Sequence, residues 1–387
     1  MNPTATYSLR QLTGYFLKLG TTGFGGPPAL IGYMHRDLVQ TRQWISEADY
    51  REGLALAQLA PGPLAAQLAI YLGYVHYQVL GATAVGLAFV LPSFLMVVAT
   101  GWAYVRFGGL PWMQSIFYGV GAAVIAIIAI GTYKLTRKTI RPTDTVGWIL
   151  FGISALTTAV LETELVWLVL ATGVVYWLVN APPHRLKTGR MGALAPGWEL
   201  LGLSPPDSLL WKLAVFFTKA GAFVFGSGLA IVPFLYGGVV KEYGWLSEQQ
   251  FLDAVAVAMI TPGPVVITVA FIGYLVAGWT GACVAALATF LPCYLLTILP
   301  APYFKRYGGQ PGIKAFVDGI TMAAVGAIAG AVVVLARRQL IPAGQPDWWA
   351  VGLALLAGLL LWRFKKLPEP ALIAGAAVVG VLVKWLT

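Results

Sequence analysis

Long stretches without a charged residue are the feature that most constrains this chain. The stretches from Val79 to Val105 and from Leu110 to Tyr133 contain no Asp, Glu, Lys or Arg. A helix that spans a bilayer needs about 20 mostly apolar residues, and both stretches are long enough. Charged residues make up 10% of the chain, whereas soluble domains carry roughly 25%. We therefore predict an all-α polytopic membrane protein in contact with membrane lipid.

The second half of the chain repeats the first. Residues 16–27 align with 217–228 at an offset of 201 (217 − 16), and after a one-residue gap Leu91-Pro92 aligns with Leu291-Pro292 at an offset of 200. The sequence therefore predicts two homologous repeats, at 7–180 and 209–387. A polar, proline-rich linker at 181–208 joins them.

Positive charge in the connecting loops indicates that the two halves have opposite orientations. Loops with more Lys and Arg lie on the cytoplasmic side. The basic loops are those with Lys134, Arg137, Lys138 and Arg141 in the first half, and Lys305, Arg306 and Lys314 in the second. Their counterparts carry fewer basic residues, namely Arg337 and Arg338, and Arg106. Because the bias alternates oppositely in the two halves, we predict an inverted repeat.

The number of membrane crossings depends on two interrupted segments. Residues 10–40 and 50–76 are apolar but contain Gly and Pro near their middle. Such segments either span the membrane as broken helices or fold back as re-entrant hairpins. We expect about 10–12 membrane helices in total.

Glycine-rich sequence interrupts an apolar segment at equivalent places in the two halves. The residues are Phe24-Gly25-Gly26-Pro27 and Phe225-Gly226-Ser227-Gly228. Backbone groups freed by such a break must be buried in protein or face a cavity, because lipid offers no hydrogen bonds. A helix that restarts after the break presents N–H groups and a partial positive charge that bind anions. The breaks are therefore candidates for an anion site, with a packing kink as the alternative.

A second pair of breaks places two prolines around one glycine. Pro61-Gly62-Pro63 and Pro262-Gly263-Pro264 cannot lie inside a regular helix. Gln58, Gln67, Thr261 and Thr268 flank these breaks and are candidate hydrogen-bond donors to an oxyanion. Corresponding interruptions in two transporter repeats are the best sequence pointer to a binding site near the membrane midplane. We predict that the four breaks meet there.

Two basic and two acidic residues lie near the breaks at equivalent positions. Lys18 and Lys219 each stand six residues before the Phe of a glycine-rich break (24 − 18 and 225 − 219). Each either neutralises a bound anion or extends to the membrane surface. Glu52 and Asp253 each stand nine residues before a Pro-Gly-Pro (61 − 52 and 262 − 253). They are candidates for proton coupling, with helix capping or pairing with a base as the alternative.

The sequence lacks the residue groups of an enzyme or an ATP-driven pump. His35, His76 and His184 are scattered, without Cys or carboxylate residues at metal-ligand spacing. The sequence contains no Walker-type phosphate loop. We expect no catalytic residue, no metal, no cofactor and no nucleic-acid partner.

The motifs resemble those of the chromate ion transporter family in its long two-domain form. They are the run from Lys18 to Pro27, Trp44-Ile45-Ser46-Glu47, and the run from Gln58 to Pro63. The resemblance covers nearly the whole chain and implies antiparallel homologous domains in the bacterial cytoplasmic (inner) membrane. It also implies a secondary transporter that exports chromate and confers chromate resistance, coupled to the proton gradient as an antiporter. The second half departs from the pattern, because Ser227-Gly228 stands where the first half has Gly26-Pro27.

We therefore expect the breaks to bind a tetrahedral oxyanion while Lys18 and Lys219 supply compensating charge. Chromate and sulfate share charge and shape, so a carrier of sulfate or another oxyanion is the first alternative. A passive anion channel is the second. A second copy of the chain, in a homodimer, is a candidate partner.

Overall fold

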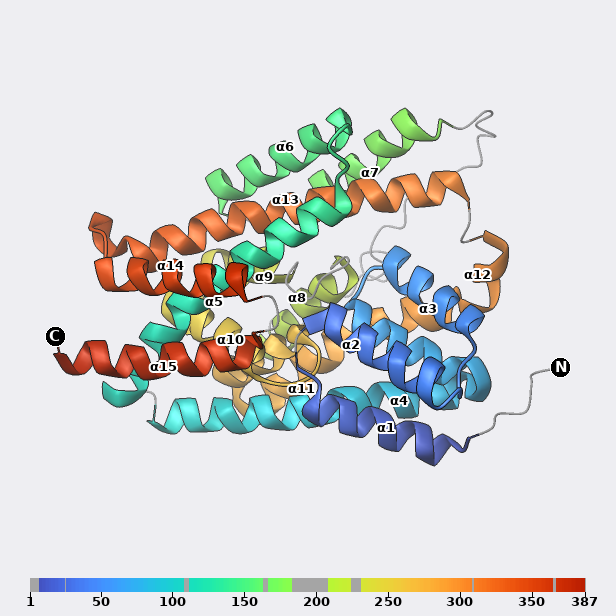
Figure 1. Ribbon diagram of the computed structural model, residues 1–387, viewed down its shortest axis with the longest axis horizontal. Coiled ribbons are helices and arrows are strands. Elements are labelled where there is room, and N and C mark those ends of the chain that lie inside the picture. Colours follow the sequence, from blue (N-terminus) through green and yellow to red (C-terminus); the bar gives the residue numbers. More distant parts are fainter. Residues whose placement is uncertain are drawn as a thin grey trace.

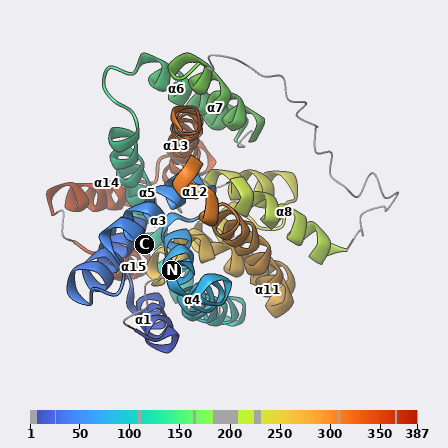
Figure 2. The ribbon, with the colours of Figure 1, turned by 90° about the vertical axis from the view of Figure 1, so that its right-hand side faces the viewer.

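The protein is built from helices. A computed structural model describes residues 7–24, 26–107, 111–162, 166–182, 208–223, 231–307, 310–364 and 367–386. No strand occurs within these ranges. The long helices run along the longest axis of the molecule (Figure 1). A view turned by 90° looks along α13 (Pro311–Leu340) nearly end-on (Figure 2). The predicted all-α fold is confirmed.

The elements of the first half come in a fixed order. They are α1 (Leu9–Thr22), α2 (Gly26–Met34), the π-helix η1 (His35–Thr41), α3 (Glu47–Leu59), α4 (Leu64–Phe107), α5 (Pro111–Thr139), α6 (Thr145–Leu161) and α7 (Val166–Asn180). The second half has α8 (Leu209–Phe223), α9 (Ile231–Leu235), the π-helix η4 (Tyr236–Glu242), α10 (Glu248–Ile260), the 3-10 turn η5 (Val265–Ile267), α11 (Thr268–Ile298), α12 (Ala301–Tyr307), α13, the 3-10 turn η6 (Pro342–Gly344), α14 (Trp348–Arg363) and α15 (Glu369–Leu386).

The two halves use the same local devices at equivalent positions. Ser46 and Ser247 cap α3 and α10, and their hydroxyl oxygens accept the otherwise unpaired N–H groups of Asp49 and Gln250. A π-helix precedes each of these helices. The halves therefore repeat in backbone structure as well as in sequence.

The longest helices exceed what one membrane crossing requires. Within the described residues, four segments are long and apolar enough to cross a membrane: Leu64–Phe107, Met113–Thr139, Val265–Phe304 and Pro311–Leu340. The 44 residues of α4 would extend roughly 66 Å at 1.5 Å per residue, about twice the hydrocarbon core. The chain turns back at Gln78 (φ 50°, ψ −141°) within α4, where Gly73 lies against Gly81, and at Gly278 (φ 61°, ψ −150°) within α11, where Gly273 lies against Gly281.

Four further apolar helices are shorter than 18 residues: Thr145–Leu161, Trp167–Asn180, Trp348–Arg363 and Glu369–Val383. The expected 10–12 membrane helices therefore stay a prediction.

Equivalent helices of the two halves pack in opposite directions. The hydroxyl oxygens of Thr83 in α4 and Tyr294 in α11 lie 2.6 Å apart. Further along α4, Phe94 packs on Trp279, with 5.8 Å between ring centroids. Both contacts lie after the turns at Gln78 and Gly278, so residues 79–107 of α4 run antiparallel to residues 279–298 of α11.

The helices α5 and α13 are also equivalent and antiparallel. Gly121 in the first half of α5 lies beside Gln339 at the end of α13. Past the end of α5, the charge of Arg141 acts on Asp318 near the start of α13. Two pairs of equivalent helices therefore contribute to the interface between the halves, together with the packing of α6 on α13 and of α5 on α15.

The halves share one hydrophobic core and present an apolar outer surface. The largest buried cluster joins Phe94 and Val124 of the first half to Phe217 and Phe251 of the second. On the outside, large apolar side chains are exposed, such as Leu355 of α14 at 70%. Extensive apolar surface of this kind marks contact with a membrane, which agrees with a multi-pass membrane protein.

Candidate functional site

The glycine-rich break of the first half separates α1 from α2. Helix α1 ends at Thr22, and the N–H of Gly23 donates to the carbonyl of Leu19 (2.7 Å). Helix α2 begins at Gly26, so Pro27 lies in its first turn, where a missing N–H costs nothing. Phe24 is 38% exposed between the two helices, and Gly25 lies outside the described residues. The predicted break is present.

The Pro-Gly-Pro break of the first half separates α3 from α4. Helix α3 ends at Leu59 and α4 begins at Leu64. Gly62 between them has a φ of 139°, which L residues rarely adopt. The 13 residues of α3 extend roughly 20 Å, less than the hydrocarbon core of about 30 Å. The geometry fits the re-entrant hairpin, of which the break is the tip.

The corresponding break of the second half has the same form. Helix α10 ends at Ile260, Thr261 caps it, and α11 starts after the 3-10 turn η5. Gly263 has a φ of 98°. The second glycine-rich motif, Phe225-Gly226-Ser227-Gly228, lies outside the described residues.

Breaks from the two halves meet at one point. The N–H of Gly263 donates to the carbonyl oxygen of Gly23 at 2.9 Å. Ser93 of α4 lies against the last turn of α1 and the break at Gly263: its hydroxyl donates to the carbonyl of Gly20 at 3.4 Å, and a Cβ added at Gly263 would overlap its Oγ. The tip of the α10–α11 hairpin therefore touches the end of α1.

Gly62 has its own neighbours. A Cβ added there would lie 2.8 Å from Gln67 Nε2 and 3.1 Å from Cys293 Sγ. Gln67 is fully buried, and its Nε2 donates to the carbonyl of Pro61 at 2.8 Å. Gln67 Oε1 has no hydrogen-bond partner in the described part of the chain. Pro63 is buried too, and its carbonyl accepts the backbone N–H of Gln67 at 3.0 Å.

The predicted basic residues lie outside this contact. Lys18 and Lys219 are both exposed, on α1 and α8. Within the described ranges neither forms an ion pair. Gln58 near the end of α3 is also exposed, whereas the Thr261 hydroxyl donates to the carbonyl of Val257 at 2.7 Å. Their predicted contacts with an anion stay predictions.

The two equivalent carboxylates differ in their surroundings. Asp253 is 3% exposed and accepts hydrogen bonds from the Tyr104 hydroxyl (2.7 Å) and Gln249 Nε2 (2.9 Å). Tyr104 belongs to α4, so this carboxylate joins the two halves. Glu52 is half-buried and accepts a hydrogen bond from Tyr71. No Lys or Arg of the described chain pairs with Asp253, so its hydrogen-bond partners there are neutral.

Sequence reasoning missed Gly23, Ser93 and Tyr104. Self-comparison does pair Ser93 with Cys293 at an offset of 200 (293 − 93). These are the residues that lie beside Gly263 and Gly62, so the repeat gave a partial signal for Ser93. The search for groups of three or more His, Cys, Asp or Glu residues that could hold a metal finds none among the described residues.

Comparisons with known proteins identify the relatives of the chain. The family model described as "Chromate transporter" matches residues 10–177 and 211–381. The "Chromate transport protein" of Cupriavidus metallidurans is 65% identical over 381 residues, which cover 97% of this chain and 94% of that protein. The "Probable chromate transport protein" of Synechococcus elongatus is 62% identical over 383 residues, covering 97% and 96%.

A shorter relative matches only part of the chain. The "Uncharacterized transporter YwrA" of Bacillus subtilis is 30% identical over 168 residues, 42% of this chain and 90% of its own length. No solved structure matches the chain. The two matched regions and the near full-length relatives show that this chain belongs to the chromate transporter family, a family of transporters rather than enzymes.

Proposed function

We propose that this protein is a secondary transporter that exports chromate across the bacterial cytoplasmic membrane, driven by the proton gradient. The family and the 65% identity to a protein named for chromate transport support the substrate. The apolar helices support a multi-pass position in the membrane.

The two halves act as an inverted repeat in this proposal. The antiparallel packing of residues 79–107 of α4 on residues 279–298 of α11 supports it, as does the alternating charge of the loops. The first repeat spans 7–180, the linker 181–208 and the second repeat 209–387. The loop from Lys134 to Arg141 faces the cytoplasm, so the opposite end of α6 faces the outside.

The breaks form the oxyanion site. The observation that carries this proposal is the hydrogen bond from Gly263 to Gly23, which brings breaks of opposite halves together. Helices restart at Gly26 and Leu64, and their first N–H groups carry the partial positive charge that favours an anion. The remaining break residues are Phe24, Gly25, Pro27, Pro61, Gly62 and Pro63, with Phe225, Gly226, Ser227, Gly228, Pro262 and Pro264 in the second half. Gln58 donates hydrogen bonds to the anion, and the Thr261 hydroxyl does so when it turns away from the carbonyl of Val257. Lys18 and Lys219 raise the local concentration of anion.

Asp253 couples transport to protons, and Glu52 is its weaker counterpart. A carboxylic acid at 3% exposure with only neutral hydrogen-bond partners is costly to ionise. Because Tyr104 and Asp253 come from different halves, a change of charge at Asp253 acts on the interface between them.

The proposal is tested with purified protein in proteoliposomes. Chromate uptake is measured with and without a pH gradient, and with sulfate as competitor. Saturable flux that rises with the gradient supports a coupled oxyanion carrier. Competition by sulfate at equal concentration would instead favour a general oxyanion carrier. Flux that does not saturate and does not respond to the pH gradient would favour a channel. An inserted, folded protein without chromate flux would refute the proposal.

A further inference from the structure

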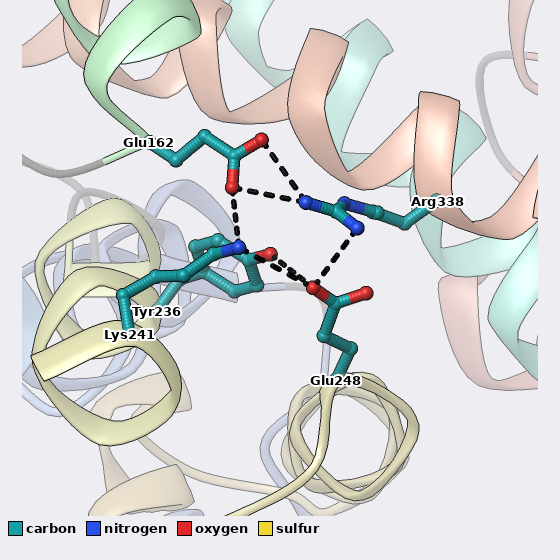
Figure 3. A network of polar contacts seen from close by, with 5 residues as sticks. All are labelled: Glu162, Tyr236, Lys241, Glu248 and Arg338. Carbon is teal, nitrogen blue, oxygen red and sulfur yellow. Dashed lines mark hydrogen bonds and ion pairs between the residues drawn. The ribbon is translucent and has the colours of Figure 1, made fainter. Parts of the chain in front are cut away.

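A cluster of charged side chains joins the two halves away from the breaks (Figure 3). Glu162 follows α6 in the first half. Its partners belong to the second half: Lys241 on η4, and Arg338 in the last turn of α13. Glu248 at the start of α10 and Tyr236 complete the cluster.

The cations are shared between the two carboxylates. Lys241 Nζ lies 2.6 Å from Glu162 Oε2 and 3.5 Å from Glu248 Oε1. Arg338 lies 3.1 Å from Glu162 and 3.3 Å from Glu248. The Tyr236 hydroxyl donates to Glu248 Oε1 at 3.1 Å. Two cations and two carboxylates thus form a closed, neutral network, in which only Glu162 comes from the first half.

Glu162 occupies its place against a backbone preference. Its φ of 56° and ψ of 20° are left-handed, and its N–H donates to the carbonyl of Thr158 at 2.9 Å. Gly or Asn is the usual residue where a helix ends in this conformation. A strained residue persists where its surroundings hold it, and such residues gather at functional sites and switches. Its carboxylate contacts with Lys241 and Arg338 are the compensation visible in the structure.

The equivalent cluster at the other end of the molecule is built differently. Glu47 is the counterpart of Glu248 (248 − 201), and it pairs with His35 and Arg51 at 2.8 Å each. Both partners belong to the first half and lie within 12 residues of Glu47. The counterpart of Lys241 is Gln40, which carries no charge (241 − 201). Within the described chain, Glu47 therefore has no ion pair to the other half.

This asymmetry has meaning in a transporter with inverted repeats. Alternating access moves one repeat against the other, so that contacts made at one end are exchanged for contacts at the other. Ion pairs between the halves at the Glu248 end and local pairs at the Glu47 end describe one of the two states. In the orientation proposed above, the Glu248 end faces outside.

We infer that Glu162, Lys241, Glu248 and Arg338 form a latch that closes the outer end of the transporter and opens in each transport cycle. This inference rests on the proposed function, because it assigns the latch to alternating access. The side chains are between 25% and 40% exposed, so water can replace each contact as the latch opens. Hydrogen bonding from Lys241 holds the pKa of the Glu162 carboxyl below its usual value, which keeps the latch charged at neutral pH.

The first test links the latch covalently. The two native cysteines are first replaced by the residues at the equivalent positions of the first half, as Cys283→Thr and Cys293→Ser. In this background, cysteines replace Glu162 and Lys241. A bifunctional methanethiosulfonate reagent bridges them, and reductant releases them. The matched control places the cysteines at Lys241 and Glu248, which both belong to the second half.

The expected result is a loss of chromate flux of at least tenfold in the cross-half link, recovered with reductant, and a change below twofold in the control. Full flux in the linked protein would overturn the latch. Equal loss in both linked proteins would overturn it too, because stiffening of η4 would then explain the block.

The second test measures distance and does not depend on flux. Spin labels at Leu161 and Tyr243, both exposed, report the separation of the halves at this end. Glu162→Gln and Glu162→Gly are both expected to add a longer distance. The Gly variant also removes the backbone strain, so strain relief cannot account for a shared effect. Glu47→Gln is the control and leaves the distance unchanged.

A single, unchanged distance in both Glu162 variants would refute the latch. The two proposals can fail separately. If the distances respond but the unlinked proteins carry no chromate, the latch stands and the proposed substrate is wrong.

Discussion

The two Pro-Gly-Pro breaks have the same sequence but different neighbours. Gly263 hydrogen-bonds Gly23 of the other half and packs against Ser93, whose hydroxyl is itself bonded to Gly20. Gly62 faces Cys293 and the end of the Gln67 side chain. Repetition therefore supplies the shape of each break, whereas neighbours that differ between the halves decide how firmly each break is held.

The largest expected effect comes from a methyl group at Gly263. Gly263→Ala must adopt a φ of 98°, and its Cβ would overlap Ser93 Oγ. Strain of this kind costs about 1–3 kcal/mol before the overlap is counted. A total near 3 kcal/mol corresponds to a loss of chromate flux of roughly a hundredfold, at about 1.4 kcal/mol per tenfold. The measurement is the initial rate of chromate flux in proteoliposomes.

Gly62→Ala is the matched comparison. Its chromate flux should fall by only roughly tenfold, because the end of the Gln67 side chain can rotate away from the new Cβ. The second substitution Ser93→Gly should recover part of the flux of Gly263→Ala and none of that of Gly62→Ala. Equal losses at the two glycines would show that the neighbours do not matter.

The second comparison concerns the two equivalent carboxylates. Asp253→Asn can still accept the hydrogen bond from Gln249 through Oδ1, while its Nδ2 donates to the Tyr104 hydroxyl oxygen, but it cannot ionise. The flux should fall to its level without a pH gradient and stop responding to one. Glu52→Gln should keep most of the response, since Glu52 is only half-buried. Chromate flux at several imposed gradients measures both. An undiminished response in Asp253→Asn would remove Asp253 from the coupling mechanism.

The third comparison is between Gln67 and its counterpart Thr268 (268 − 67 = 201). Gln67→Leu leaves the Pro61 carbonyl without its donor, and a buried unpaired group costs about 1–3 kcal/mol. Thr268 donates to Val265 within its own turn at 2.8 Å, so Thr268→Val should cost less. Thermal unfolding in detergent measures the difference. A larger loss of stability in Thr268→Val would show that the side chain behind the break matters more in the second half than in the first.

Local features of the fold followed from the sequence. Two prolines around a glycine exclude a helix from the chain alone, and the breaks lie where Pro61 to Pro63 and Pro262 to Pro264 predicted them. The caps at Ser46 and Ser247 are also local, because the hydroxyl bonds an N–H three residues later. Such features need no knowledge of the rest of the molecule.

Contacts between distant segments did not follow from the sequence. The bond between Gly263 and Gly23 spans 240 residues (263 − 23), and both partners are backbone groups that leave no pattern in the sequence. Tyr104 is one of 17 tyrosines in the chain, and only the packing of α4 selects it as the partner of Asp253. Self-comparison finds equivalent positions, but it does not tell which face of each helix meets the other half.

The smallest expected effect is that of the two equivalent lysines, and here the halves should agree. Lys18 and Lys219 are both exposed, so each acts on an approaching anion through water, where a charge at 4 Å contributes about 1 kcal/mol. Lys18→Ala and Lys219→Ala should each raise the KM for chromate by about fivefold or less and leave the maximal flux unchanged, and Lys18→Arg should restore it. Because exposed charges are screened by salt, the difference in KM between the variants and the unmodified protein should vanish at about 1 M ionic strength.

Lys138→Ala, on the exposed end of α5, controls for the net charge of the protein. An unchanged KM in the double lysine variant would leave the helix N-termini as the only positive end of the oxyanion site, while a salt-resistant effect would place the lysines in direct contact with the bound anion.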